Sequence, residues 1–449
     1  MSISQLLDLA VRHHQEGQLP KAEALYRRVL SAAPDNFTAL NNLGNLLNKQ
    51  AKYDEAQIPC RQATLVNDAS GEAHYNLANS MFGLRRYGEA IAGYRRAIAA
   101  NPGYGPACNN LGNALNEQGE FQEAISSYRQ AVALAPDLAE AHYNLGNALV
   151  NLPGGFPEAI RQYKKAILAK PGYLEPRTCL AIFSWIHGDW PALAGDIQKL
   201  AHANIHDRFA GPFYLFLSRL LAYRELHPEE YAAGRDLPVL PLLGDSHCLS
   251  PAHAVIHYKE NRYRAEPRII MGCKAWHLAN ETGNKFKYWF EQQVASLAEG
   301  VAVVVMFGEI DCRIDEGIIH HFKKTGNGLE SSIARLVTNY VAYVARVLTS
   351  RNISPVFHGV PAPFADKGKP AAHDLKLLSR IISLFNQALA RETAARKFFF
   401  SDVYALTNDQ NGFSSGKYYI DKRHLLPPVL GHLLNNDQSV TSRRQSLDG

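Results

Sequence analysis

The sequence lacks the features of a membrane protein, a secreted protein or a nucleic-acid-binding protein. No apolar run approaches the ~18 residues that a transmembrane helix needs. The first residues show no basic segment followed by an apolar one, as a signal peptide would. Lys and Arg number 47 against 42 Asp and Glu, and a net charge of +5 over 449 residues does not indicate nucleic acid. We therefore expect a cytoplasmic protein with no membrane span and no nucleic-acid partner.

Cysteine and histidine occur without the spacings that bind metals. The six cysteines stand singly, with no CxxC pair, and no HExxH motif is present. We therefore expect no disulfide framework, no metal site and no cofactor. Apolar residues, by contrast, make up 46% of the chain and charged residues 20%, which is enough for packed cores. At roughly 150 residues per domain, the length allows about three domains.

A period of 34 residues runs through the first part of the chain. Each copy offers two amphipathic helical stretches separated by a turn, and such units bury their apolar faces only by stacking. The pattern therefore predicts an all-α solenoid. Small residues recur at one position of the copies and tyrosines at another, where we expect the rings to fill gaps between neighbouring repeats. These residues are Gly44, Ala78, Gly112 and Gly146, and Tyr26, Tyr94, Tyr128 and Tyr163.

This pattern resembles the tetratricopeptide repeat (TPR), in about five copies over residues 1–173. The resemblance implies a superhelical arm that recruits a peptide or a protein. In the second copy Cys60 stands where the aromatic residue belongs and Asp68 where proline belongs, which predicts poorer packing there. Residues 174–236 remain helical in pattern but lose the period, and we expect a degenerate repeat, capping helices and a linker.

Two asparagines spaced three residues apart recur in four of the repeats, so that both amides face one side of a helix. Asparagine is a poor helix former, and eight copies inside helices need a reason. Stacked repeats would align them into a ladder on the concave wall, where amides suit an extended peptide backbone. The ladder looks like that of the O-linked N-acetylglucosamine transferase repeats, which implies binding of extended polypeptide. The alternative is that the asparagines cap or bridge neighbouring helices and bind nothing. They are Asn42, Asn45, Asn76, Asn79, Asn110, Asn113, Asn144 and Asn147.

After Asp236 short apolar runs alternate with longer amphipathic stretches. Continuous β-branched and aromatic runs separated by helices predict a parallel sheet covered on both faces. We therefore expect an α/β/α three-layer domain of flavodoxin-like topology over 237–435, followed by a disordered polar tail at 436–449. The expected strands are 237–243, 267–272, 301–307, 354–360 and 397–403, and the expected helices 281–299, 329–349 and 371–395.

Two short motifs fall where such a sheet places its sites, at the carboxyl ends of the strands. Gly244 permits a tight turn directly after the first strand, which lifts the hydroxyl of Ser246 to the edge of the sheet. Asp421 and His424 lie three residues apart after the last strand. On a turn the carboxylate reaches one imidazole nitrogen while the other nitrogen faces the serine, which is the arrangement that activates a weak nucleophile.

These residues resemble the SGNH/GDSL family of hydrolases over roughly 237–435. The resemblance implies that Ser246 is the nucleophile, His424 the general base and Asp421 its orienting partner. It also implies that the N–H of Gly272 helps to bind the oxyanion. In the family's third block, usually Gly-x-Asn-Asp, Ile310 replaces the asparagine that donates to the oxyanion. Losing one such donor typically costs roughly 100- to 1000-fold in rate.

Further charged residues flank these motifs and are candidates for binding substrate. Arg313 offers a substitute donor or binds an acidic group of the substrate, and an ion pair that fixes the loop is the alternative. Glu309, Asp311 and Asp245 are the other substrate-binding candidates.

The sequence therefore favours a serine ester hydrolase with a TPR arm that recruits a peptide or protein. An O-acyl group on a carbohydrate or a glycosylated protein is the expected substrate. Two alternatives remain open. In the first, the repeats are an adaptor beside a catalytically idle α/β domain. In the second, the same triad transfers the acyl group to a sugar hydroxyl.

Overall fold

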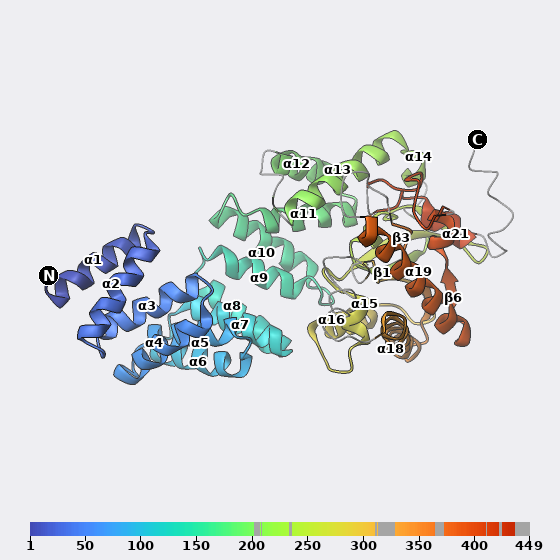
Figure 1. The fold of residues 1–449 in the computed structure, drawn as a ribbon. Coiled ribbons are helices and arrows are strands. Elements are labelled where there is room, and N and C mark those ends of the chain that lie inside the picture. Colours follow the sequence, from blue (N-terminus) through green and yellow to red (C-terminus); the bar gives the residue numbers. More distant parts are fainter. Residues whose placement is uncertain are drawn as a thin grey trace. The chain divides into compact units, whose positions relative to one another are not determined.

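The computed structural model describes residues 1–201, 207, 209–232, 236–309, 312, 328–363, 372–409, 411–421 and 424–435. The chain forms two compact units, which Figure 1 shows coloured along the sequence. The first unit comprises Met1–Val150 and Gly155–Tyr173, and the second comprises Asn151–Gly154 and Leu174–Gly449. Among the described residues no helix is both long enough and apolar enough to cross a membrane. The tail predicted at 436–449 lies outside the described residues.

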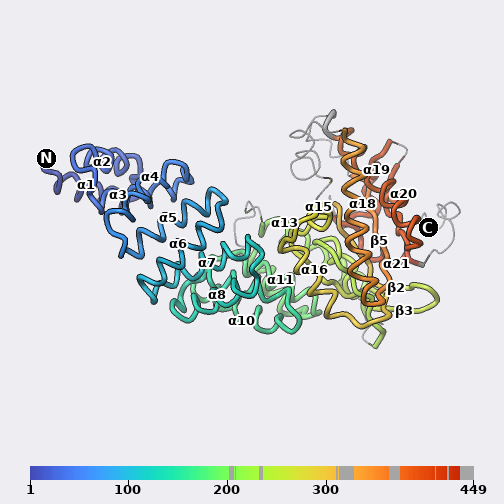
Figure 2. The backbone as a smooth tube through the Cα atoms, turned by 90° about the horizontal axis from the view of Figure 1, so that it is seen from below, coloured from blue at the N-terminus to red at the C-terminus, as the bar shows by residue number. Residues whose placement is uncertain are grey.

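The first unit is described throughout and consists of ten helices, which confirms the predicted all-α solenoid. Helices follow in pairs that repeat the 34-residue period, as the backbone traces show (Figures 1 and 2). The helices are α1 (Ile3–Gln15), α2 (Leu19–Ala32), α3 (Phe37–Lys49), α4 (Tyr53–Val66), α5 (Gly71–Gly83), α6 (Tyr87–Ala100), α7 (Gly105–Gln118), α8 (Phe121–Leu134), α9 (Ala139–Leu149) and α10 (Phe156–Ala169).

The recurring small residues and tyrosines pack against each other inside a repeat. A Cβ atom added to Gly112 would lie 2.6 Å from the ring of Tyr128, and one added to Gly146 would lie 2.7 Å from that of Tyr163. These rings were predicted to fill gaps between neighbouring repeats; their contact with the small residue lies inside one repeat, while Tyr94 also interacts with Asn110 of the following repeat. The small residue leaves its space between the two helices of one repeat, and the buried ring occupies that space.

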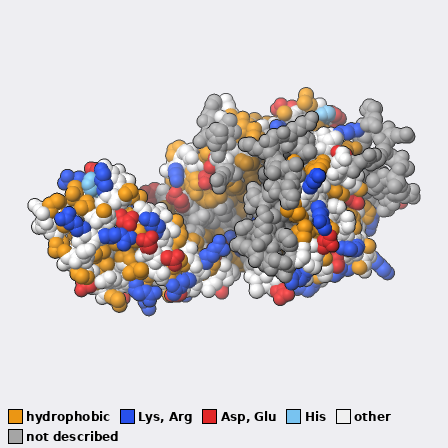
Figure 3. All heavy atoms as spheres, viewed as in Figure 1, with side chains coloured by type: hydrophobic (Ala, Val, Ile, Leu, Met, Phe, Trp, Pro, Cys, Tyr) orange, Lys and Arg blue, Asp and Glu red, His pale blue; other side chains and the backbone are white. Residues whose placement is uncertain are grey.

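Charged side chains of both signs are interspersed on the surface of this unit (Figure 3). Some of them join the second helices of consecutive repeats, as Arg95 and Glu123 do at 2.5 Å and Arg129 and Glu158 at 3.0 Å. Three of these side chains are about half exposed and that of Glu158 is 29% exposed, and such surface pairs contribute only about 0–1 kcal/mol each. Stacking of the apolar faces therefore holds the array together.

The second unit starts with helices and continues as a six-stranded sheet. The helices are α11 (Leu174–His187), α12 (Trp190–Ala201), α13 (Ala210–Leu226) and α14 (Glu229–Ala232). The sheet has the order β2-β3-β1-β4-β5-β6. Its strands are β1 (Val239–Gly244), β2 (Val255–Tyr258), β3 (Asn261–Ile269), β4 (Ala302–Met306), β5 (Ser354–His358) and β6 (Phe399–Ser401).

Five strands are parallel to their neighbours, which confirms the predicted parallel sheet. Taken in chain order they run 2-1-3-4-5, the order of flavodoxin-like sheets. The sixth strand, β2, pairs antiparallel with β3 at the edge and was not predicted. Its hairpin turns at Lys259 and Glu260, whose φ angles are 47° and 52°. This turn lacks the Asn-Gly or Asp-Gly signal that usually marks such a hairpin.

Both faces of the central strands are covered. Consecutive residues of a strand point to opposite faces, and Leu242 and Leu243 of β1 are both fully buried, as are Val304 and Val305 of β4. The crossover helices α16 (Lys285–Ala295), α18 (Leu329–Thr349) and α19 (Ala372–Ala395) follow β3, β4 and β5.

The crossover helices form one layer, because neighbours contact each other. Tyr343 of α18 donates a hydrogen bond to Glu291 of α16, and Thr338 of α18 donates one to Glu392 of α19. Short helical elements are also present among the described residues. They are η1 (Ser246–Leu249), α15 (Ala275–Ala279), α20 (Val403–Thr407) and α21 (Val429–Asn435). Of these, α21 packs against β2.

Candidate active site and repeat groove

The turn after β1 carries the predicted nucleophile. A Cβ atom added to Gly244 would lie 2.7 Å from the carbonyl oxygen of Met306 on β4, so only glycine allows the two strand ends to approach this closely. Ser246 follows at the start of η1 and is half-buried. The chain passes from β1 to β3 on one side and later to β4 on the other. Ser246 therefore lies at the switch point of the sheet, where α/β folds bind their ligands.

Three of the predicted site residues come together at this point. The Oγ atom of Ser246 lies 3.2 Å from Nε2 of His424. On the other side of the ring, Nδ1 of His424 lies 2.8 Å from Oδ2 of Asp421. The second oxygen of Asp421 accepts a hydrogen bond from the backbone N–H of His424 at 2.7 Å. The carboxylate thus fixes both the ring and the backbone of the histidine.

The surroundings of His424 favour its neutral form. Burial lowers the pKa of the imidazole, and the nearby His247 lowers it further, while the hydrogen bond and charge of Asp421 and the charge of Glu309 raise it. Burial is the largest influence, so the pKa lies below its ordinary value. A neutral ring that donates from Nδ1 to the carboxylate leaves Nε2 free to accept the proton of Ser246. The arrangement is therefore competent for general-base chemistry.

The predicted oxyanion glycine lies on the neighbouring strand end. Strand β3 pairs with β1 so that Ile269 is opposite Gly244, and the N–H of Ile270 donates to the carbonyl of Gly244 at 2.8 Å. Gly272 follows three residues after Ile269, at a φ of 71° that favours glycine. The pairing thus brings the loop of Gly272 next to the turn of Ser246.

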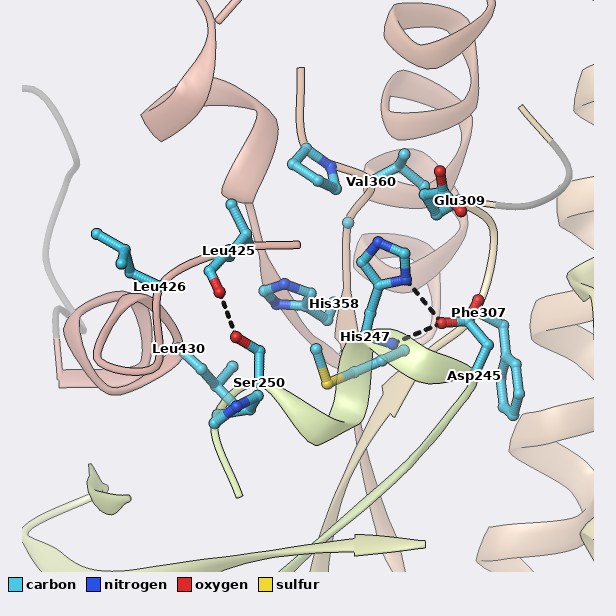
Figure 4. Close-up of a pocket in the computed structure, with 14 residues that line it drawn as sticks. Asp245, His247, Ser250, Phe307, Glu309, His358, Val360, Leu425, Leu426 and Leu430 are labelled. Atoms are coloured by element: carbon cyan, nitrogen blue, oxygen red, sulfur yellow. Dashed lines mark hydrogen bonds and ion pairs between the residues drawn. The ribbon is translucent and has the colours of Figure 1, made fainter. Parts of the chain in front are cut away.

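Asp245 stabilises the turn that carries Ser246. It is buried, and its Oδ1 atom accepts a hydrogen bond from the backbone N–H of His247 at 2.9 Å and lies 2.8 Å from Nδ1 of that ring (Figure 4). Its Oδ2 atom has no hydrogen-bond partner within the part of the chain that the structure describes. Asp245, predicted to bind substrate, therefore supports His247 with one oxygen.

A cavity of about 30 Å³ lies beside this turn, with room for roughly two water molecules. Asp245, His247, Glu309 and His358 contribute polar groups to its wall, and most of the remaining lining is apolar (Figure 4). Glu309, a predicted binding residue, is thus near the triad. Ile310, Asp311 and Arg313, which were also singled out, lie outside the described residues.

Sequence reasoning missed His358, which ends β5 inside this cavity. It is buried, burial lowers its pKa to about 3, and its Nδ1 atom lies 3.1 Å from the hydroxyl of Ser401 on β6. The available signal was a histidine at the carboxyl end of an apolar strand. Such a ring is neutral at any physiological pH and contributes hydrogen bonds rather than charge.

One group of metal-ligand side chains gathers among the described residues. His227, Glu229 and Glu230 have ligand atoms within 4.8 Å of one another, and Glu230 accepts a hydrogen bond from the hydroxyl of Tyr223. Glu229 is exposed and Glu230 and His227 are half-buried, and exposed acidic groups commonly gather without an ion.

The predicted asparagine ladder is a hydrogen-bonded network between repeats. Asn110 donates to Oδ1 of Asn79 at 3.0 Å, and Asn144 donates to Oδ1 of Asn113 at 3.1 Å. The same oxygens accept from tyrosines of their own repeats, as in the 2.8 Å bond from Tyr94 to Asn79. The asparagines therefore bridge neighbouring helices, which was the structural alternative to peptide binding.

Part of the ladder nevertheless lines a groove of about 330 Å³ in the first unit. In this groove the Oδ1 atom of Asn45 is buried without a hydrogen-bond partner among the described residues. Asn79, Asn113 and Asn147 occupy the same position in later repeats and accept from a tyrosine, but the second repeat has Cys60 instead. The ladder residues of the lining are Asn45, Asn76, Asn79, Asn110 and Asn113.

Comparison with known proteins identifies the first unit. Tetratricopeptide-repeat models match residues 25–58 and 71–104, and a TPR-repeat model matches residues 112–152. The first unit is an array of tetratricopeptide repeats. The repeats support a protein-interaction function for this TPR array. No curated protein matches the chain.

Solved structures similar to this chain include two that are described as TPR proteins. MamA is 27% identical, with a TM-score of 0.33 over 36% of this chain and 94% of that one. TTC0263, a thermophilic TPR protein of Thermus thermophilus, is 24% identical, with a TM-score of 0.35 over 39% of this chain and 95% of that one. YrrB, described as a TPR protein with an unusual peptide-binding site, is 23% identical, with a TM-score of 0.32 over 38% of this chain and 88% of that one.

Proposed function

We propose that the second unit is a serine ester hydrolase of the SGNH/GDSL type and that the TPR array recruits a peptide or protein. The observation that carries the proposal is the chain of hydrogen bonds from Ser246 through His424 to Asp421. Its position at the switch point of a parallel sheet adds support.

In the first half of the reaction, Oγ of Ser246 attacks the carbonyl carbon of an ester while Nε2 of His424 takes its proton. The N–H groups of Ser246 and Gly272 hold the negative charge on the carbonyl oxygen. Asp421 keeps the protonated ring in place and stabilises its charge. As the ester bond breaks, the imidazolium gives its proton to the leaving alcohol, and an acyl-Ser246 ester remains.

In the second half, water replaces the alcohol. His424 removes a proton from the water, the resulting hydroxide attacks the acyl carbon, and the acid leaves as the proton returns to Ser246. The substrate class that we propose is an O-acyl group on a carbohydrate or on a glycosylated protein. An array that binds polypeptide would bring such a substrate to the same chain.

The test is labelling of the purified full chain with a fluorophosphonate probe, measured by intact mass, with Ser246→Ala as the matched control. We expect one adduct on the wild type and none on the variant. Esterase turnover on acylated sugars should then fall by about 10⁴-fold or more in Ser246→Ala, because the residual rate comes only from binding and oxyanion contacts. A variant that keeps full turnover would refute the proposal.

A second candidate function has its own support. The repeats alone account for an adaptor that binds a partner, with the α/β unit as a scaffold, and the substitution at Ile310 favours an idle site. Absence of labelling in the wild type, with or without a partner bound, would favour this alternative.

A further inference from the structure

Helix α13 brings an aromatic ring face to face with His424. The rings of Phe216 and His424 are stacked, with centroids 3.7 Å apart and planes inclined by 17°. The side chain of Phe216 is 1% exposed, so it occupies a fixed, packed position. Its ring covers a face of the imidazole, which keeps water from that face and restricts rotation of the histidine.

The helices before the sheet contact both turns that carry the triad, α13 at one turn and α11 at the other. Arg219, three residues after Phe216 on α13, donates a hydrogen bond to the carbonyl oxygen of Ile420 at 3.3 Å, next to Asp421. On α11, the fully buried Trp185 donates from Nε1 to the carbonyl oxygen of Leu249 at 2.8 Å, at the end of the helix that begins with Ser246. The helices before the sheet are therefore part of the wall of the site.

Several polar or charged groups of the described residues also interact with His424. The ring of His247 lies with its centroid 4.7 Å away, and Asp421 bonds to Nδ1. Glu309 acts on the imidazole through its charge, and Arg219 of α13 is a cation that contacts the turn among the described residues. Phe216 thus adds an apolar stacking contact to a ring that also interacts with these groups through charge or hydrogen bonds.

We propose that Phe216 is a positioning residue of the hydrolase, which holds the imidazole of His424 in line with Ser246 and keeps it dry and neutral. The inference rests on the proposed function for its catalytic consequence. Its physical part, the shielding of the ring, stands independently of that function.

The experiment titrates His424 by NMR in the full chain labelled at histidine carbons, with the resonance assigned through His424→Gln. We expect Phe216→Leu to raise the pKa of His424, because water regains access to a ring whose pKa burial lowers. A fall in pKa would mean that the ring stabilises the imidazolium through its π face, and would overturn the inference.

The matched control is Phe213→Leu. Phe213 lies one turn earlier on the same helix. Its ring packs against that of Phe209, with the ring centroids 5.4 Å apart, instead of against His424. The same loss of a ring there should leave the titration of His424 unchanged. Equal shifts in both variants would mean that α13 acts only by general packing, which would also overturn the inference. Phe216→Tyr, which keeps the ring, should restore the wild-type titration.

Kinetics provide the second readout. Fluorophosphonate labelling of Phe216→Leu should slow by about 10-fold or more, because small displacements of a base are costly, and its pH profile should shift to higher pH. If Phe216→Leu does not fold, Phe216→Met replaces it, since it keeps the buried volume without a ring. A wild type that is not labelled refutes the proposed function, while an unchanged titration in Phe216→Leu refutes the role of Phe216 alone.

Discussion

The two units of this chain use polar side chains in contrasting ways. In the TPR array the bonded asparagines lie 31 or 35 residues apart, close to one repeat, so the same contact recurs along the array. In the second unit Ser246 and His424 are 178 residues apart and meet once. The first network therefore follows from the period of the sequence, whereas the second depends on the complete fold of its unit.

The contrast extends to what each network can tolerate. A contact that recurs is shared among several equivalent positions, and the loss of one costs about one hydrogen bond. A contact that occurs once has no substitute. When residues act as a unit in catalysis, removal of one of them abolishes nearly the whole rate enhancement of the unit. Changes in the second unit should therefore give large effects on rate, and changes in the array small effects on stability or affinity.

The largest effect that sharpens this contrast is expected for Asp421→Asn. The amide would donate to Nδ1 of His424, which places the ring proton on Nε2, where it cannot accept from Ser246. We expect kcat to fall by about 10⁴-fold. Because the carboxylate raises the pKa of His424, its loss should lower that pKa further and move the acid limb of the rate profile to lower pH.

A matched control for this prediction is Asp402→Asn. Asp402 also accepts a backbone N–H, that of Ala405 at 3.0 Å at the start of α20, and asparagine caps helices equally well. Turnover should stay at the wild-type level. A similar loss in both variants would show that Asp421 only shapes its turn.

The fold was predictable where the signal is local and continuous. Strand β4 and most of β1, β5 and β6 are continuous apolar runs, and the helices between them show the period of 3.6 residues. Strand β3 (Asn261–Ile269) was predicted only at its end, as 267–272, because most of its residues are polar or charged. Strand β2 was missed because it is a short edge strand, whose turn at Lys259 and Glu260 has no typical hairpin residues. The contact of each tyrosine with the small residue of its own repeat was not predicted, because a period gives positions but not the direction of a side chain.

The candidate site was predictable only in part, for the same reason. Ser246, Asp421 and His424 belong to short motifs that stand out in the sequence. Phe216 and His358 carry no motif, and their relation to the site arises from tertiary packing. The sequence shows Cys60 where the other repeats have a tyrosine. That this leaves the acceptor of Asn45 without a partner is recognised only from the tyrosine hydrogen bonds of the other repeats.

A smaller effect, on stability alone, is expected in the array for Gly112→Ala. The added Cβ atom would lie 2.6 Å from the ring of Tyr128, and such overpacking costs about 1–3 kcal/mol. All four tryptophans lie in the second unit, so tryptophan fluorescence follows that unit while far-UV circular dichroism follows both. In chemical unfolding, Gly112→Ala should show a lower midpoint of the dichroism signal than the wild type. Turnover of the folded variant should equal that of the wild type. Gly172→Ala, where no atom lies within 4 Å of the added Cβ, should unfold like the wild type, and equal midpoints in the two variants would contradict the packing argument.

The smallest effect concerns the free acceptor in the groove. Asn45→Ala removes an oxygen that has no partner among the described residues, together with a 3.3 Å bond to Asn76. If a bound peptide donates a backbone N–H to that oxygen, affinity should fall by about 1 kcal/mol, roughly 5-fold, with little change in the free energy of unfolding. The measurement is titration calorimetry with a peptide selected by the full chain from a random display library.

Asn79→Ala should behave differently, because its oxygen accepts from Tyr94 and Asn110 and its loss leaves both donors unpaired, which lowers stability. Unchanged affinity in Asn45→Ala would mean that the ladder serves only to join the repeats, and the two networks would then differ in function as well as in sequence range.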